Sequence, residues 1–433
     1  MLLAGISPAV SSVGLFNYPQ LLSQFKLELL NLVFSMGVIV LQSVHLGLVC
    51  DDASRKILSR AGSLPEVSNT DEGRTDTQEG GGTLETKEFL KRMVEATGVS
   101  GYEDSVGTVI RDVMAAHADE VTVDTLGNVI ALKRGEGENR PKVMLASHMD
   151  EIGLMITKIE EKGFLRFTSI GGVDQRTLVA QEVRVHGRRD LLGIIGMKPP
   201  HLLTPEEANV AIKMQDMVID VGLTEEEVRA AVAVGDLVTI NRNFIPLSGD
   251  FAAAKAMDDR AAVAAMHQCL IELKRMRHTA DAFAVATVQE EVGARGALVS
   301  AYHIKPDIGI AIDVCHGDMP GVPEQDTAPL GKGPNLALGA NIHPKVFERL
   351  TELAKEHNLP FTLDPVPGPT GTDAWVMQVT RAGIPTGLVS LPLRYMHTSV
   401  ETLSFRDIEL TGRLLALFVA SVDREFVEGL LCY

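Results

Sequence analysis

The sequence predicts an α/β fold, in which helices pack against a sheet, with a small β-rich domain inserted into it. Amphipathic helical segments and short apolar strands alternate before residue 155 and again after residue 249, which is typical of layered α/β proteins. Between residues 156 and 248 the chain instead consists of short β-rich segments separated by Gly/Pro turns. The return to helices and strands after Gly249 indicates that this block is inserted between two strands of the first domain.

The elements of the first domain are predicted from hydrophobic periodicity. Apolar residues at helical spacing predict helices over 86–96 and 103–117. Apolar runs bounded by Gly, Pro and Asn predict strands over 120–124, 129–133 and 142–146. After the insertion, a small-residue helix is expected over 261–273, and buried strands are expected over 282–288, 308–312 and 387–391.

The inserted block is expected to hold strands over 182–186, 193–196 and 236–240. The segment Pro199-Pro200-His201 begins a loop that leads into a short helix predicted near 206–211. The residues of the block do not themselves show whether it forms subunit contacts or covers a cleft.

Composition and charge narrow the class of protein. A chain of 433 residues, 45% of them hydrophobic, predicts two or three domains with a large buried core. The net charge of -17 argues against a nucleic-acid partner, because phosphates would be repelled. The four cysteines lie far apart without a CxxC pair, so we expect a reduced, cytoplasmic protein.

Residues 1–84 are expected to form an N-terminal extension. The apolar run Leu29 to Cys50 has the length of a membrane span or a secretory segment, but Asn31, Gln42 and His45 weaken both interpretations. Residues 51–82 are polar and rich in Gly, Ser and Thr, which predicts a disordered linker. Membrane association, export and a start codon assigned too far upstream stay open as alternatives.

Five short polar segments, each at the end of an apolar run, carry the candidate site. The first contains His148 and Asp150, which lie two residues apart and would face one side of an extended strand. His148 is a candidate metal ligand and Asp150 the group that orients its ring. The alternative is a strand-end histidine bonded to a neighbouring aspartate for structural reasons only.

The second and third segments add carboxylates. Asp258 precedes a helix, where a carboxylate can bridge two cations, whereas Asp259 and Arg260 are expected to form a helix cap and a local ion pair. Glu290 and Glu291 end a buried strand, where unpaired charge costs several kcal/mol, so a cation or a raised pKa is predicted. One of the two glutamates could bind metal while the other takes a proton from water.

The fourth and fifth segments follow the same design. Asp313 ends the buried strand 308–312, and His397 follows the strand 387–391. Strands that end in polar groups at one edge are how open α/β sheets build their sites. His316 is a lone loop histidine and is left out of the candidate ligands. Imidazoles with several carboxylates, one able to bridge and one left as a base, suit a hydrolase with two metal ions.

These segments resemble the M42 family of metallo-aminopeptidases, also called tetrahedral or glutamyl-aminopeptidase-like. The resemblance rests on motifs that occur in the same order from about Thr86 to Phe426: His148-x-Asp150, Met257-Asp-Asp-Arg260, Glu290-Glu-Val-Gly293, Asp313 and Arg394-Tyr-Met-His397. The segments Lys198-Pro-Pro-His201, Gly331-Lys-Gly-Pro334 and Gly371-Thr-Asp-Ala374 match as well.

The resemblance implies a three-layer metallopeptidase domain with a mixed sheet, formed by 85–155 and 249–433, and a dimerisation domain at 156–248. It further implies two divalent cations, zinc or cobalt, around a shared water. His148 and Asp313 would hold one ion, Glu291 and His397 the other, and Asp258 would bridge them. Glu290 would be the general base and Asp150 would orient His148. Peptides are the implied substrates, and dimers that assemble into a hollow dodecamer are the implied oligomer.

Other functions stay open from the sequence. Adjacent glutamates could indicate a glycoside hydrolase, but that mechanism has no use for His148 and His397. A related metallo-deacylase or carboxypeptidase could share much of the metal site, and a non-enzymatic assembly subunit is a further alternative. The preferred N-terminal residue and the physiological metal are not encoded by these motifs.

Overall fold

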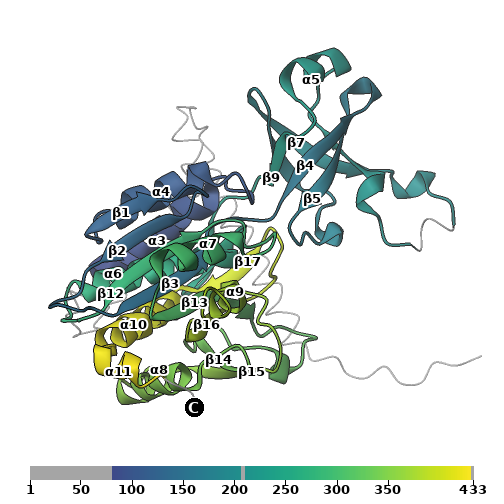
Figure 1. Cartoon of the computed structure of the whole chain (residues 1–433). Helices are drawn as coiled ribbons and strands as arrows, with labels where there is room; N and C mark the ends of the chain where they lie inside the picture. Colours follow the sequence, from purple (N-terminus) through teal and green to yellow (C-terminus); the bar gives the residue numbers. More distant parts are fainter. Residues whose placement is uncertain (1–79, 206–209, 431–433) are drawn as a thin grey trace, which may run out of the picture. The chain divides into compact units, whose positions relative to one another are not determined.

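The computed structural model describes residues 80–205 and 210–430. The predicted membrane or secretory segment, the predicted linker up to residue 79, and most of the short helix predicted near 206–211 lie outside these ranges. None of the helices in the described part of the chain is long and apolar enough to cross a bilayer. Figure 1 shows the chain with the element labels used below.

The larger domain is built on an eight-stranded mixed sheet. Its strands run in the order β1-β2-β12-β3-β13-β16-β14-β15. The central strands β12, β3, β13 and β16 are mutually parallel. Strand β2 is antiparallel to both of its neighbours, β1 and β12, and β14 is antiparallel to β16 but parallel to β15. The bounds are β1 (Glu120–Val123), β2 (Val129–Lys133), β3 (Lys142–His148), β12 (Asp281–Thr287), β13 (Ile308–His316), β14 (Asn335–Gly339), β15 (Thr362–Val366) and β16 (Thr386–Leu393).

Helices pack on both faces of this sheet and make three layers (Figure 1). Alternate strand residues face opposite layers: Val143 and Leu145 belong to one buried cluster, and Met144 and Ala146 belong to the other. One layer consists of α3 (Gly80–Glu95), α4 (Asp104–Met114), α6 (Met257–Leu273), α8 (Pro344–Glu356) and α10 (Phe405–Ser421). The other contains α7 (Arg295–Ile304) and α9 (Asp373–Gln378). The last helix of the described chain is α11 (Arg424–Glu428).

Helix α6 lies at the centre of this domain because its side chains are mostly small and buried around the whole helix. It contacts strand β3 of the sheet on one side and α10 on the other. A helix that is apolar on all sides is typical of a buried position. A three-stranded sheet of β10 (Ile245–Pro246), β11 (Phe251–Ala254) and β17 (Glu401–Ser404) lies beside it, with β17 in contact with α6.

The inserted domain is a closed antiparallel barrel with its own buried core. Its strand order is β4-β5-β8-β7-β6-β9. The bounds are β4 (Gly153–Ile159), β5 (Leu165–Ile170), β6 (Glu182–His186), β7 (Asp190–Met197), β8 (Met217–Asp220) and β9 (Leu237–Ile240), with helix α5 (Glu225–Ala231) between β8 and β9. The predicted α/β fold with a β-rich insertion is therefore confirmed.

Several boundaries differ from the sequence-based expectation, and two of them are of particular interest. Helix α3 begins at Gly80, so the last three residues of the predicted linker are helical. Strand β13 runs on to His316, beyond the predicted end at Ile312, because Val314 and Cys315 still pair with β16. Asp313 is therefore a residue within a strand and not one that follows it.

Candidate metal centre

Parallel strands bring three of the predicted segments to one edge of the sheet. His148 is the last residue of β3 and pairs with Thr287, the last residue of β12. Glu290 and Glu291 follow β12 directly, and Asp313 lies near the carboxyl end of β13 on the other side of β3. Residues far apart in the chain thus meet because their strands are neighbours and run in the same direction.

Asp258 and His397 complete the group from outside the sheet. Asp258 lies at the start of α6, and its carboxylate is between two imidazoles. Its Oδ1 is 3.1 Å from His148 Nε2, and its Oδ2 is 3.3 Å from His397 Nε2. Glu291 Oε1 lies 3.5 Å from the same His397 nitrogen. The two oxygens of Asp258 therefore each face a different histidine, which is the arrangement that a bridging carboxylate needs.

The spacing of these atoms fits a divalent cation. Ligand atoms of His148, Asp258 and Glu291 lie within 4.8 Å of one another, as do those of His148, Asp259 and Asp313. Two ligand atoms about 2.1 Å from a tetrahedral zinc ion are about 3.4 Å apart, close to the separations from Asp258 to the imidazoles. The structure thus brings together all five predicted metal ligands.

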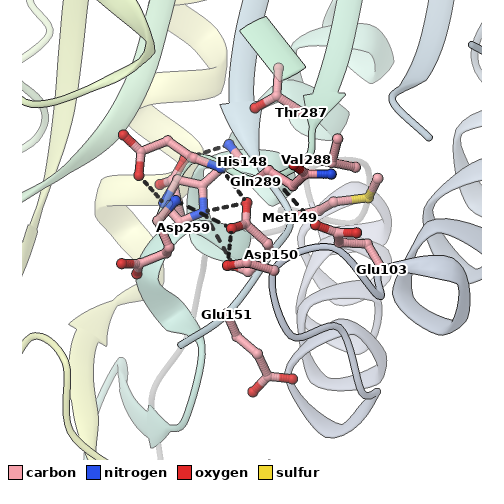
Figure 2. Close-up of polar contacts among 12 residues, drawn as sticks. Glu103, His148, Met149, Asp150, Glu151, Asp259, Thr287, Val288 and Gln289 are labelled. Atoms are coloured by element: carbon pink, nitrogen blue, oxygen red, sulfur yellow. Dashed lines mark hydrogen bonds and ion pairs between the residues drawn. The ribbon is translucent and has the colours of Figure 1, made fainter. Parts of the chain in front are cut away.

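Asp150 is buried at the base of the group and is held by several hydrogen bonds (Figure 2). Its carboxylate accepts from Ser100 Oγ at 2.6 Å and from the backbone N–H groups of Glu290 and Glu291. His148 Nδ1 lies 3.2 Å from the backbone oxygen of Asp150 and 3.5 Å from its carboxylate. Strand β3 ends before Asp150, so the turn after the strand, and not strand alternation, places this carboxylate beside the ring.

Three of the buried carboxylates carry raised pKa values because negative charge is concentrated away from water. Burial, followed by repulsion from Asp313 and neighbouring acids, raises the pKa of Glu290 to about 9. Burial and the charge of Asp258 raise the pKa of Glu291 to about 7, and the same two causes raise the pKa of Asp313 to about 8. A divalent cation would replace the protons that these groups otherwise retain, so the donor set fits a metal ion.

The pKa values of the two imidazoles are also raised, but the cause is attraction to neighbouring carboxylates and not burial. Burial by itself lowers the pKa of His148, but the carboxylates of Asp150 and Asp258 outweigh burial and hold this pKa well above its usual value. The hydrogen bond with Asp258 raises the pKa of His397 to about 10. Burial opposes ionisation of Asp258, yet hydrogen bonds with the two histidines keep its pKa below the ordinary range. Asp258 is therefore the carboxylate that stays ionised between the two rings.

The predicted helix cap and local ion pair at Asp259 and Arg260 are wrong. Asp259 is buried, and its Oδ2 accepts from the hydroxyl of Ser147 at 2.6 Å and from the backbone N–H of His148 at 3.2 Å. Regular helical geometry begins only after Asp259. Asp259 thus does not cap α6. It bonds instead to the end of β3 and supports the backbone that carries His148.

Arg260 pairs across the fold instead of with its neighbour. It is fully buried and donates to Glu151 Oε1 at 3.2 Å and to the backbone oxygens of Met93, Ala96 and Met149. Lys255 Nζ donates to the other oxygen of Glu151 at 2.6 Å. The buried carboxylate of Glu151 is thus neutralised by two cations, which connects α3, α6 and the turn after β3 close to the candidate centre.

Two buried acids near the centre were not singled out from the sequence. Glu401 accepts from the backbone N–H of Asp258 at 3.1 Å and from that of His397 at 2.8 Å, so one carboxylate positions two candidate ligands. Asp373 accepts from Thr287 Oγ1 at 2.6 Å. The signal for Glu401 was present, since this glutamate follows His397 by four residues in the same polar segment. Asp373 belongs to a motif noticed only for its resemblance.

A cavity of about 1020 Å³ opens over the group. His148, Asp258, Glu290, Glu291, Asp313 and His397 line its floor. The remaining walls include Asp326 and Asp364, together with Leu363 and Trp375. Among the residues that the structure describes, none of those lining this cavity is Lys or Arg. A cavity of this size admits one end of a peptide.

The chain is similar to known aminopeptidases along most of its described length. Residues 127–414 match the family model described as M42 glutamyl aminopeptidase. The chain is 40% identical over 332 residues to the lysyl aminopeptidase of Pyrococcus furiosus, covering 76% of this chain and 94% of the relative. An aminopeptidase from Desulfurococcus kamchatkensis has a similar structure, with a TM-score of 0.76, 37% identity, and coverage of 81% of this chain and 99% of that chain.

The TET1 peptidase of Pyrococcus horikoshii, whose structure is described as assembling into a tetrahedron or a large octahedral shell, is similar as well. Its TM-score is 0.68 at 30% identity, and the match covers 78% of this chain and all of that one (100%). The fold and these relatives define the class of protein as a metallopeptidase that acts on peptide N-termini. The chain belongs to the M42 glutamyl aminopeptidase family, which implies a divalent metal ion.

Proposed function

We propose that this aminopeptidase removes N-terminal residues from peptides with two divalent cations, zinc or cobalt. The supporting observation is the Asp258 carboxylate, which turns one oxygen to His148 and the other to His397. His148 and Asp313 would hold one ion, Glu291 and His397 the other, and Asp258 would be shared. When bound, such a pair polarises the scissile carbonyl and lowers the pKa of a water molecule.

Glu290 is the general base of this proposal. Its carboxylate lies 4.0 Å from His148 Nε2, and its backbone N–H donates to Asp150 Oδ1 at 3.0 Å, which fixes its position. Its raised pKa indicates a carboxylate that binds a proton readily in this surrounding. Glu290 takes the proton of the attacking water and passes it to the leaving amine nitrogen. Asp150 acts by holding the ring of His148 and the backbone of Glu290.

The test replaces the base while keeping the metal ligands. Glu290→Gln is expected to lower kcat on aminoacyl reporter substrates by about 10²- to 10⁴-fold, because the proton acceptor is lost. The metal content per chain stays at the wild-type value. Glu356→Gln, an exposed glutamate at the end of α8, is the control and keeps wild-type activity. Full turnover by Glu290→Gln would refute the assignment.

Metal removal and the choice of reporter substrate distinguish the aminopeptidase from the alternative enzymes. A chelator is expected to abolish reporter hydrolysis, and added zinc or cobalt to restore it. A glycoside hydrolase would keep its activity on sugar substrates under chelation. A metallo-deacylase or carboxypeptidase would cleave N-acyl or C-terminal reporters in preference to substrates with a free N-terminal amine.

The cavity favours a substrate with a basic N-terminal residue. Beyond the metal group it presents the carboxylates of Asp326 and Asp364. A cationic side chain would be attracted to these walls, and the relative with 40% identity is a lysyl aminopeptidase. We expect higher kcat/KM for lysyl than for glutamyl reporters. Asp364→Asn lowers the lysyl value and leaves a leucyl reporter unchanged, and equal rates on all three reporters in the wild type would contradict the preference.

The barrel is proposed to form the contacts between subunits, with dimers that assemble into a dodecamer. Strand β7 exposes Leu192 and Ile194, with 62% and 55% of their surfaces accessible. Large aliphatic side chains that alternate outward on one strand make an apolar surface suited to association. The Pyrococcus horikoshii relative assembles into closed shells, and twelve subunits as six dimers fit the edges of a tetrahedron.

A further inference from the structure

A second group of metal-binding side chains lies away from the candidate centre. Glu85 of α3, His117 in the turn after α4 and His267 in α6 offer ligand atoms that lie within 4.8 Å of one another. Glu85 Oε1 is 2.7 Å from His117 Nε2 and 3.9 Å from His267 Nε2. Three separate stretches of the chain therefore converge on one point in the helical layer.

This group is distinct from the candidate centre although both use α6. His267 follows Asp258 by nine residues, which places it roughly 13 Å farther along the helix at 1.5 Å per residue. The residues of the second group do not line the cavity over the candidate centre. A ligand at the second group would therefore be separate from the proposed peptidase chemistry.

The hydrogen bonds of His267 determine which ring nitrogen is free to bind a ligand. Thr86 Oγ1 donates its proton to Gln268 Oε1 at 3.0 Å, so toward His267 Nδ1, at 3.4 Å, this oxygen acts as an acceptor. His267 Nδ1 accordingly carries the ring proton, and the lone pair lies on Nε2, which faces Glu85. A metal-binding histidine typically uses its other ring nitrogen in this way to fix the ring.

The Nε2 atom of His267 is unusual because it is buried without a hydrogen-bond partner among the described residues. His267 is fully buried. Its ring packs edge-on against His117 at 4.9 Å between centroids and is tilted against Phe89 at 4.8 Å. Because an unpaired buried nitrogen destabilises a fold, an apolar residue would serve packing better at this position. The nitrogen is instead aimed at a carboxylate and a second imidazole.

We propose that Glu85, His117 and His267 bind a divalent cation of zinc type that joins α3 to α6. Two imidazoles and one carboxylate are a set that zinc prefers, with a water molecule in the fourth position. Ligand atoms on zinc are roughly 3.4 Å apart, so the Glu85 carboxylate would withdraw slightly from His117. Its side chain is 44% exposed, so it has solvent-filled space on one side for this movement. The cation would accept the lone pair of His267 Nε2.

The test is a count of bound zinc on the full chain. Protein stripped with a chelator is reloaded with zinc, desalted, and analysed for zinc per chain by mass spectrometry. Glu85→Gln and His267→Phe are each expected to bind one equivalent less than the wild type. The control is His303→Gln, an exposed histidine on α7, which is expected to match the wild type.

The outcomes separate this site from the proposed catalytic centre. Both variants are expected to keep wild-type hydrolysis of aminoacyl reporters, since neither residue contacts that centre. If reporter hydrolysis is absent even in the wild type, the difference in zinc content still tests the second site. Equal zinc content in the wild type and Glu85→Gln overturns the proposal. Because Glu85 is partly exposed, Glu85→Gln is expected to fold even if His267→Phe does not, and its zinc content then decides the test.

Discussion

At the scale of single residues, Glu103 links stability to pH through burial. It is 7% exposed, and its Oε1 accepts from the backbone N–H groups of Gly101 at 2.6 Å and Gln289 at 3.1 Å (Figure 2). Burial, reinforced by the charge of Asp150, raises its pKa to about 7, against 4.5 for the ordinary carboxyl group. Between these values the folded state binds more protons than the unfolded state.

The raised pKa of Glu103 predicts how the free energy of unfolding changes with pH. The contribution of Glu103 to the free energy of unfolding is complete below pH 4.5 and is lost as the pH rises through 7. Glu103→Gln keeps the acceptor oxygen and removes the titration. The wild type is therefore expected to lose stability relative to this variant between pH 5 and pH 8, on the order of 1–3 kcal/mol. Thermal unfolding of both proteins at constant zinc concentration measures the difference.

Glu161→Gln is the matched control, because Glu161 is an exposed glutamate in the barrel. Its unfolding midpoint should follow that of the wild type at every pH. Parallel curves for Glu103→Gln and the wild type would show that the buried carboxyl group does not titrate in this range.

Residues of the candidate site could be predicted from the sequence where neighbouring residues mark them. A polar side chain at the end of a buried strand, as at His148 or Glu291, is visible in sequence because the apolar run beside it is visible. The role of Asp259 was predicted wrongly for the opposite reason. Its partner, Ser147, is more than one hundred positions away, and no local pattern indicates that hydrogen bond.

At the scale of elements, the contact between α6 and α10 depends on Gly412. A Cβ atom at this position would lie 2.6 Å from Gln268 Cβ and 2.8 Å from the backbone oxygen of Ala265. The backbone oxygen cannot move without displacing α6. The glycine therefore sets the distance between two buried helices.

Gly412→Ala is expected to destabilise the fold. Alanine improves helix propensity by about 1 kcal/mol, but overpacking a buried contact typically costs about 1–3 kcal/mol, so the net loss is up to about 2 kcal/mol. The midpoint of thermal unfolding reports this change. Gly368→Ala serves as the control, because a Cβ atom there meets nothing within 4 Å. Equal midpoints for the two variants would mean that the helices have room to separate.

Elements were predicted well where periodicity was strong. Strands β2 and β6 have the predicted bounds, because turn residues flank each of them. The exposed end of β13 was underestimated, since pairing with β16 and not hydrophobicity carries it to His316. Strand length in a sheet depends on the neighbour as well as on the strand itself.

At the scale of the whole molecule, the proposed assembly rests on the outer surface of the barrel. Leu192→Asp together with Ile194→Asp places charge on the exposed face of β7, where burial in a subunit contact would be costly. Light scattering after size-exclusion chromatography is expected to show a large oligomer for the wild type and a smaller species for the double variant.

Val123→Asp is the comparison for this experiment, since Val123 is 51% exposed on the edge strand β1 of the other domain. It should retain the mass of the wild type. If the double variant also retains that mass, the subunit contact lies elsewhere on the molecule.

The sequence by itself determined the class of fold, the presence of an insertion and the kinds of side chain available for a metal site. These properties are local, because they depend on periodicity and on the residue that follows each apolar run. Only the tertiary structure decided that Asp258 faces two histidines, that Arg260 pairs with Glu151, and that a second group forms around His267. The reason is strand order and helix packing: β12 and β13 flank β3, although more than one hundred residues separate β3 from either strand.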